Sequence, residues 1–174
     1  MLHCLNDGEL INIRPAKRRD WTKTMNMVFK VFMEYEAPEY GLEGTQEFYE
    51  FIHDDRLKKM FLNGAYILLV AENEDKEIIG MISLRSGNHI SLLFVNSDYH
   101  KKGVATALME EMIEILKEHT SYNTITVHAA PYATGFYHKL DFKDTDVQQQ
   151  DGGIIYIPME KIFRYDSWDN RLSG

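Results

Sequence analysis

The chain has 174 residues, 44% of them hydrophobic and 26% charged, a composition typical of one ordinary globular domain and unlike that of disordered, collagen-like or disulfide-built proteins. Its 27 acidic and 19 basic residues give a formal net charge of −8, which argues against general binding to nucleic acid phosphates. The apolar runs are far shorter than the ~20 residues of a membrane span, and no signal-peptide pattern is present. The single cysteine, Cys4, cannot form an internal disulfide. We therefore expect a cytoplasmic protein without a membrane partner.

The first half of the chain predicts a strand followed by helices. Apolar and polar residues alternate over 9–14, as in a half-buried strand. A helix is expected over 20–35, with Asp20 as its N-cap and one apolar side formed by Trp21, Met25, Val28 and Phe32. Pro38 and Gly41 interrupt the pattern, and 45–63 predicts one or two short helices rich in aromatic residues.

The region of these helices is strongly acidic. Between residues 31 and 55 there is no Lys or Arg, and the acidic residues are Glu34, Glu36, Glu39, Glu43, Glu47, Glu50, Asp54 and Asp55. Such a run either forms a solvated helical surface or attracts a cationic ligand, and the sequence leaves both interpretations open.

The second half alternates between strands and helices. Strands are expected over 65–71, 77–84, 89–95, 124–128, 142–149 and 154–159, and helices over 104–118 and 132–140. Gly152 and Gly153 indicate a hairpin between the last two strands. This order predicts a single domain over 1–174 of the α/β or α+β class, a mixed sheet covered by helices. The aromatic tail 162–174 is expected to dock on the body or on a partner, and a homodimer is one possibility.

A strand, a short polar loop, a glycine and an amphipathic helix follow one another over 90–109. The start of such a helix presents free N–H groups and the positive end of its dipole, which suits a phosphate ligand. Gly103 permits close backbone approach, and Lys101 and Lys102 add positive charge. Neither the Walker P-loop spacing nor the Rossmann glycine fingerprint is present. The segment by itself is compatible with a purely structural role.

A second informative segment is 129–142. It places Ala133, Tyr137 and Leu140 on one helical face, so Tyr137 is expected to point inward. A buried phenol needs a partner for its hydroxyl. Tyr137 is therefore either a core tyrosine bonded to a backbone carbonyl or a residue of a functional site.

Taken together, the two segments resemble the GNAT superfamily of acetyl-coenzyme-A-dependent N-acetyltransferases. The main family motif, [Q/R]-x-x-G-x-[G/A], corresponds to HKKGVA at 100–105, and the later motif F-Y-x-K-L-G-F corresponds to FYHKLDF at 136–142. The resemblance covers 11–161 and implies a mostly antiparallel mixed sheet of about six or seven strands with splayed central strands. His100 departs from the usual Gln or Arg, His128 from a strand Asn that often meets the pantetheine arm, and Asp141 from the usual Gly.

The resemblance also implies a mechanism, the direct attack of a primary amine on the thioester of acetyl-CoA through a tetrahedral intermediate, with no metal. The residues that it implies for the cofactor are Phe94, Val95, His100, Lys101, Lys102, Gly103, Val104, Ala105, Thr106 and His128. Tyr137 aligns with the general acid that protonates the departing thiolate. His89 is a candidate for the base, because a neutral imidazole can accept a proton. A surface position for His89, a glutamate base from the acidic helices and a water chain to solvent remain open.

The acceptor side of the cleft is walled in this family by the first two helices. The resemblance therefore implies that Glu34, Tyr35 and Glu36 contact the acceptor, and the acidic segment favours a small cationic amine or a basic peptide. The alternative is a GNAT-fold module that binds acetyl-CoA as a sensor without catalysis.

Overall fold

The protein is built on a single twisted sheet of nine strands, seen in the computed structural model, which describes residues 1–163. The strands are β1 (Leu2–Cys4), β2 (Leu10–Pro15), β3 (Ile67–Glu72), β4 (Ile78–Arg85), β5 (His89–Val95), β6 (Thr124–Ala129), β7 (Lys143–Asp144), β8 (Gln149–Asp151) and β9 (Ile154–Ile162). Their order is β1-β2-β3-β4-β5-β6-β9-β7, with β8 also paired to β9. Every pair is antiparallel except β5 with β6, so the sheet is mixed and mostly antiparallel as expected.

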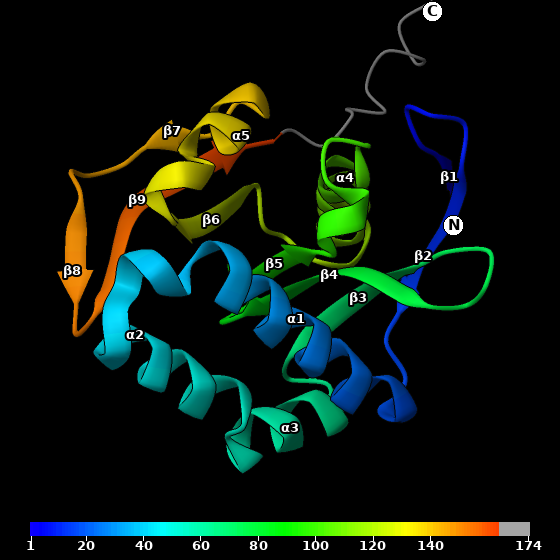
Figure 1. Ribbon diagram of the computed structural model, residues 1–174. Helices are drawn as coiled ribbons and strands as arrows, with labels where there is room; N and C mark the ends of the chain where they lie inside the picture. Colours follow the sequence, from blue (N-terminus) through cyan, green and yellow to red (C-terminus); the bar gives the residue numbers. More distant parts are fainter. Residues whose placement is uncertain (164–174) are drawn as a thin grey trace, which may run out of the picture.

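Helices cover both faces of this sheet (Figure 1). The helices α1 (Trp21–Tyr35), α2 (Ala37–Ile52) and α3 (Asp55–Leu62) lie on one face, and α4 (Val104–His119) and α5 (Thr134–Lys139) lie on the other. Each face has its own hydrophobic core, because the alternating side chains of the strands point to opposite sides. In the described part of the chain, no helix is long and apolar enough to cross a membrane.

Periodic apolar residues form the buried stripes of the two long helices. Trp21, Met25, Val28 and Phe32 of α1 are all buried, as predicted. On the other face α4 buries Val104, Leu108, Met112 and Leu116, again at helical spacing. These two helices therefore sandwich the centre of the sheet, where α4 packs against β3, β4 and β5 and α1 packs against β4 and β5.

Three elements differ from the expectation. The sheet has nine strands rather than six or seven, because the edge strand β1 pairs with β2 and the expected strand over 142–149 is divided into β7 and β8. Helix α2 begins at Ala37 instead of residue 45. Gly41 does not end it but forms a kink with φ 67° and ψ −166°, a conformation that glycine adopts at little cost.

Asp20 precedes α1 without capping it through its side chain. The carboxylate is only 5% exposed and is used in an ion pair with Arg14, whose Nη1 lies 2.7 Å from Asp20 Oδ2. The same guanidinium also contacts Glu72, with Nη2 2.9 Å from Oε2. The predicted cap was wrong because the Asp20 carboxylate instead pairs with the half-buried guanidinium of Arg14, which also engages Glu72.

The central strands β5 and β6 separate soon after they meet. Only two residue pairs join them in parallel, His89 with Thr126 and Ile90 with Val127. Beyond these pairs β6 continues along β9 while β5 continues along β4. The expected splay of the central strands is thus confirmed, and it opens the sheet next to Phe94.

The beginning of the aromatic tail packs on the body. Phe163 is 6% exposed, belongs to the core on the α4 face and donates its backbone N–H to the carbonyl of Asn123. Tyr165 and Trp168, the other large aromatics expected to dock, lie outside the described residues.

Candidate active site

Two cavities meet where the central strands splay. One has a volume of about 690 Å³ and lies beside the start of α4, and we call it the α4 cavity. The other has a volume of about 560 Å³ and lies between α1, α2 and the open face of β5, β6 and β9, and we call it the α2 cavity. The residues that line both are Leu93, Phe94, Tyr132, Ala133 and Tyr137. Two ligands bound in these cavities would therefore face one another across this shared wall.

The loop before α4 carries a concentration of free backbone donors. Lys101 and Gly103 both have positive φ values, 61° and 98°, which turn the chain sharply into the helix. Among the described residues, no acceptor is found for the N–H groups of residues 101–106, in keeping with the free first turn of a helix. Because the helix dipole is positive at this end, the loop has the donors and the field that suit an anion in the α4 cavity.

Most of the residues expected to bind the cofactor line this cavity. Those that do are Phe94, Val95, His100, Lys101, Gly103, Val104, Ala105 and Thr106. Lys139 of the second motif lines it too and adds a second positive charge beside that of Lys101. The structure thus brings the two motifs together around one cavity, although they are separated in the sequence by α4 and β6.

His100 has a specific task in this loop. Its Nε2 lies 2.7 Å from the carbonyl oxygen of Val95, so this nitrogen is protonated and donates to the end of β5. The imidazole ring also lies 5.0 Å from the ring of Tyr35. His100 therefore holds the loop in shape through these two contacts.

Two of the residues expected at the cofactor lie elsewhere. The ammonium group of Lys102 is 2.9 Å from Asp7 Oδ2 and 3.6 Å from Glu9 Oε2, and its side chain does not line the α4 cavity. Only its backbone amide remains available to an anion. His128 lines the α2 cavity, because its position in β6 places it on the opposite face of the sheet from Val127 and Ala129.

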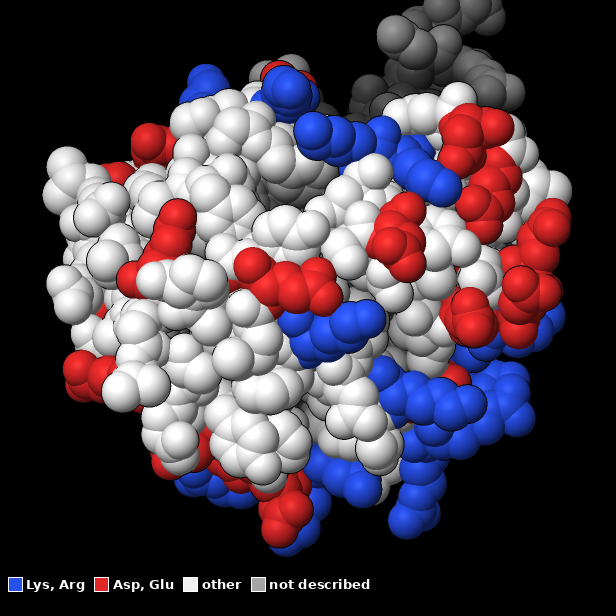
Figure 2. All heavy atoms as spheres, in the orientation of Figure 1, with Lys and Arg blue, Asp and Glu red and all other residues white. Residues whose placement is uncertain are grey.

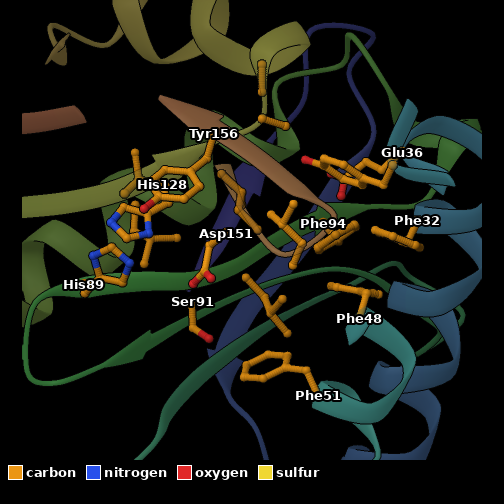
Figure 3. Close-up of a pocket in the computed structure, with 18 of the residues that line it drawn as sticks. Phe32, Glu36, Phe48, Phe51, His89, Ser91, Phe94, His128, Asp151 and Tyr156 are labelled. Atoms are coloured by element: carbon orange, nitrogen blue, oxygen red, sulfur yellow. The ribbon is translucent and has the colours of Figure 1, made fainter. Parts of the chain in front are cut away.

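The α2 cavity has an aromatic wall (Figure 3). Phe32 of α1 and Phe48 of α2 stack with ring centroids 3.9 Å apart, and Phe48 lies 5.8 Å from Phe94 of β5. Tyr40 and Phe51 extend this wall. Such a surface suits an apolar or cationic body rather than a strongly hydrated one.

One carboxylate of the acidic segment stands at the shared wall. Tyr132, which lines both cavities, donates its hydroxyl to Glu36 Oε1 at 2.6 Å. Burial raises the pKa of Glu36, the hydrogen bond from Tyr132 opposes that rise, and the charge of Glu39 adds to it. Glu36 is therefore a partly desolvated carboxylate within reach of a ligand in the α2 cavity.

The other acidic residues are placed differently. Glu47 also lines the α2 cavity, whereas Glu34 is exposed and lines neither cavity, and Tyr35 lines the α4 cavity. Figure 2 shows acidic side chains spread over the visible face rather than gathered in one patch. Of the expected acceptor contacts, the structure therefore places Glu36 alone in the α2 cavity.

Tyr137 is buried between the two cavities. It is 6% exposed, lines both, and its ring lies 5.2 Å from each of the rings of Phe136 and Phe142. Within residues 1–163 no hydrogen-bond partner of its hydroxyl is found, so it is not a core tyrosine tied to a carbonyl there. Burial, and then the charge of Glu36, raise the pKa of Tyr137, so the phenol is protonated at neutral pH.

His89 lies at the far end of the α2 cavity. Its Nδ1 is 2.8 Å from Thr126 Oγ1, and its ring is 4.6 Å from that of His128. Burial lowers the pKa of His89 to about 4, with further contributions from His128 and Arg85. His89 is five positions before Phe94 in β5, which corresponds to ~16 Å at the usual rise of an extended chain.

Several lining residues were missed by the sequence reasoning. Lys139 could have been found, since it belongs to the quoted motif. Tyr132, Arg85, Asp151 and Tyr156 also line the α2 cavity, and no local pattern marks them. They meet only because β4, β5, β6 and β9 are neighbours in the sheet. Among the described residues there is no group of three or more His, Cys, Asp or Glu side chains suited to a metal ion.

Comparisons with known proteins agree with this geometry. Residues 36–163 match a family model described as an acetyltransferase (GNAT) domain. The fold is similar to a GCN5-related N-acetyltransferase from Rhodopseudomonas palustris, at 21% identity over 87% of this chain and 95% of that chain, with a TM-score of 0.75.

Two further solved structures contain coenzyme A. The PaiA N-acetyltransferase from Thermoplasma acidophilum, in complex with coenzyme A, has 21% identity over 88% of this chain and 99% of that chain, with a TM-score of 0.71. The spermidine N-acetyltransferase from Vibrio cholerae, in complex with coenzyme A and spermine, has 17% identity over 87% of this chain and 95% of that chain, with a TM-score of 0.64. At these identities the likeness concerns the fold. A comparison with curated proteins finds no match.

Proposed function

The chain belongs to the GNAT family of acetyltransferases, which use acetyl-CoA as donor, and on that premise we propose that it acetylates a primary amine of a small molecule or peptide. The observation that carries this proposal is the shared wall between the two cavities, where Phe94 and Tyr137 face both. A donor in one cavity and an acceptor in the other would react across the splayed strands, with the buried phenol beside them.

The α4 cavity fits the donor. Coenzyme A carries anionic phosphates, and the free N–H groups of residues 101–106 together with Lys101 and Lys139 supply donors and positive charge in an otherwise acidic protein. The end of β5 at Phe94 and Val95 has no partner in β6, so this edge of the strand is open to an extended arm, although the Val95 carbonyl already accepts a hydrogen bond from His100. When bound, acetyl-CoA supplies the reactive thioester.

The acceptor amine must lose a proton before it can attack the thioester. An alkylammonium group has a pKa of ~10.4 and is almost fully protonated at neutral pH. Glu36 attracts the ammonium group, and the burial that raises the pKa of its carboxyl makes it a stronger base than an ordinary glutamate. His89 is the weaker candidate, because its pKa of about 4 makes it a poor base and it lies far along β5.

The departing thiolate must in turn gain a proton. Tyr137 is protonated at neutral pH, lies at the shared wall and has a hydroxyl without a partner in the described structure. We assign to it the role of general acid. The absence of a competing hydrogen bond supports that role, because a hydroxyl already held by a carbonyl would be oriented away from the thiolate.

The acceptor is proposed to bind in the α2 cavity with its amine near Glu36. The aromatic wall and the carboxylates of Glu36, Glu47 and Asp151 favour a cationic group on an apolar body. The spermine complex of the Vibrio cholerae relative is consistent with such a class of acceptor. The sensor alternative predicts binding of acetyl-CoA without turnover.

The proposal is tested by the release of coenzyme A thiol from acetyl-CoA in the presence of a panel of primary amines. We expect amine-dependent thiol release, and a rise of a few degrees in melting temperature at saturating acetyl-CoA. Glu36→Gln should lower kcat/KM about 10²-fold or more, whereas Glu74→Gln, a matched change in the exposed turn after β3, should not. A melting shift without turnover for any amine would instead establish the sensor.

A further inference from the structure

Arg85, at the far end of the α2 cavity, has no ion-pair partner within residues 1–163. Arg85 is the last residue of β4 and lies directly across from His89 of β5. No carboxylate within salt-bridge distance of its guanidinium is found in the described residues, although Arg14 in the same sheet engages two. Among the described residues Arg85 is therefore an unpaired cation, exposed at the end of a cavity that its acidic residues would otherwise make negative.

An irregularity in the sheet brings Arg85 and His89 to this face together. The register of β4 with β5 shifts by one residue between Ser83 and Leu84, which leaves Ser91 without a partner in β4. On one side of Ser91, Leu92 and Phe94 belong to the core on the α1 face. On the other side, Ile90 belongs to the core on the α4 face. The shift thus turns His89 onto the face that carries Arg85.

Four neighbouring strands then contribute one side chain each to a row. Arg85 of β4 lies across from His89, the ring of His89 meets that of His128 edge to face, and His128 stacks on Tyr156 at 4.2 Å. Figure 3 shows the two histidines and Tyr156 at one end of the cavity and Glu36 at the other. Burial keeps the pKa of both histidines low, so at neutral pH they are neutral hydrogen-bonding groups and Arg85 carries the charge of the row.

The cavity carries a carboxylate near the shared wall and an arginine at its far end, and aromatic rings line its middle together with Ser91 and Asp151. Glu36 lies at the shared wall, and the rings of Phe48 and Phe51 line the cavity between its two ends. Arg85 lies across from His89, which is five positions before Phe94 in β5, or ~16 Å at the usual rise of a strand. A ligand that fills this space presents its amine to Glu36 and its opposite end to Arg85.

We propose that the acceptor carries a carboxylate at the end opposite its reactive amine, and that Arg85 binds this carboxylate. The class is an ω-amino carboxylate or a short peptide rather than a polyamine, and the inference rests on the proposed acetylation of an amine in this cavity. The planar guanidinium fork matches a carboxylate in two parallel hydrogen bonds. His89 Nε2, which has no partner in the described residues, lies beside it as an additional group for the same ligand.

Among anions, a single carboxylate is the one that the other charges of the cavity repel least. Glu47 and Asp151 line the same space, so a doubly charged phosphate would meet two negative groups for its one arginine. A second amine at that end, as in a polyamine, would instead meet the positive charge of Arg85. The length of the cavity between Glu36 and Arg85 selects for a long, dipolar acceptor.

The experiment compares matched acceptors by coenzyme A thiol release. For ω-amino acids of increasing chain length, kcat/KM is measured beside that of the corresponding carboxamides, which keep the shape and lose the charge. We expect the carboxylates to be preferred about tenfold or more, a difference of ~1.4 kcal/mol, with the preference shrinking as salt is added. Arg85→Gln should remove most of the preference, and Arg85→Lys should leave an intermediate one, because lysine keeps the charge and loses the fork.

The controls separate this inference from the proposed function. Arg18→Gln removes an exposed arginine that lines neither cavity and should keep the wild-type preference. The melting temperature of each variant with acetyl-CoA confirms that it is folded and binds the donor. Equal rates for carboxylates and carboxamides, or a full preference in a folded Arg85→Gln protein, would overturn the inference while acetylation stands. No thiol release with any amine would overturn both.

Discussion

Replacing Tyr137 by phenylalanine separates its chemical role from its packing. The ring keeps its contacts with Phe136 and Phe142. The hydroxyl has no partner in the described structure, so the variant loses no protein hydrogen bond and none of the ~1 kcal/mol that such a bond adds to the free energy of unfolding. We expect an unchanged melting temperature and unchanged stabilisation by acetyl-CoA. The loss of a general acid should nevertheless lower kcat by about 10²–10⁴-fold, measured by thiol release.

Tyr66 provides the matched control. It is 1% exposed, and its hydroxyl lies 2.7 Å from Ser83 Oγ and 3.0 Å from Ser91 Oγ. Tyr66→Phe should therefore destabilise the fold by about 1–3 kcal/mol, because it leaves buried hydroxyls without a partner. Wild-type kcat in Tyr137→Phe, or a loss of stability as large as that of Tyr66→Phe, would refute the reasoning.

Two further predictions concern His89 and the glycine at the start of α4. Burial lowers the pKa of His89 from 6.5 to about 4. As the pH falls between these values the unfolded chain therefore takes up a proton that the folded chain does not, and the free energy of unfolding decreases. Urea titrations over that range should show a smaller loss of stability for His89→Gln than for wild type, and an equal loss would contradict this. Gly103→Ala forces a side chain into φ 98° and should cost ~1 kcal/mol while weakening acetyl-CoA binding in calorimetry. Gly135→Ala, in α5 with open space around the added Cβ, should instead be neutral or stabilising, and similar effects of the two substitutions would refute the assigned role of the turn.

The periodic elements and the two motifs were predictable from the sequence. The stripes of α1 and α4 follow directly from the spacing of their apolar residues, since a helix of 3.6 residues per turn must bury such a stripe. The free donors before α4 follow from Gly103 and the helix that it begins, and Tyr137 follows from its place on the inner face of α5. These are local properties, decided by residues close together in the chain.

The direction of single side chains was not predictable in the same way. Lys102 and Lys101 are neighbours in the sequence, but Asp7 and Glu9, which lie almost a hundred residues earlier, pair with Lys102 and take it out of the α4 cavity. Asp20 likewise is occupied by Arg14 instead of capping α1. In both cases a charged group outside the helix or loop concerned decides between options that the local pattern does not distinguish.

The sequence by itself thus indicated the family fold through its two motifs, and it determined the helix start at Gly103 and the buried tyrosine, because periodicity and turn chemistry act over a few residues. Only the tertiary structure decided which residues line the α2 cavity, the proposed acceptor site. Glu36 meets Tyr132 across 96 residues, and Arg85, His89, His128 and Tyr156 align through strand order and a one-residue register shift. A shift of one residue reverses the face on which a strand side chain lies, and no local pattern in the chain specifies where such a shift occurs.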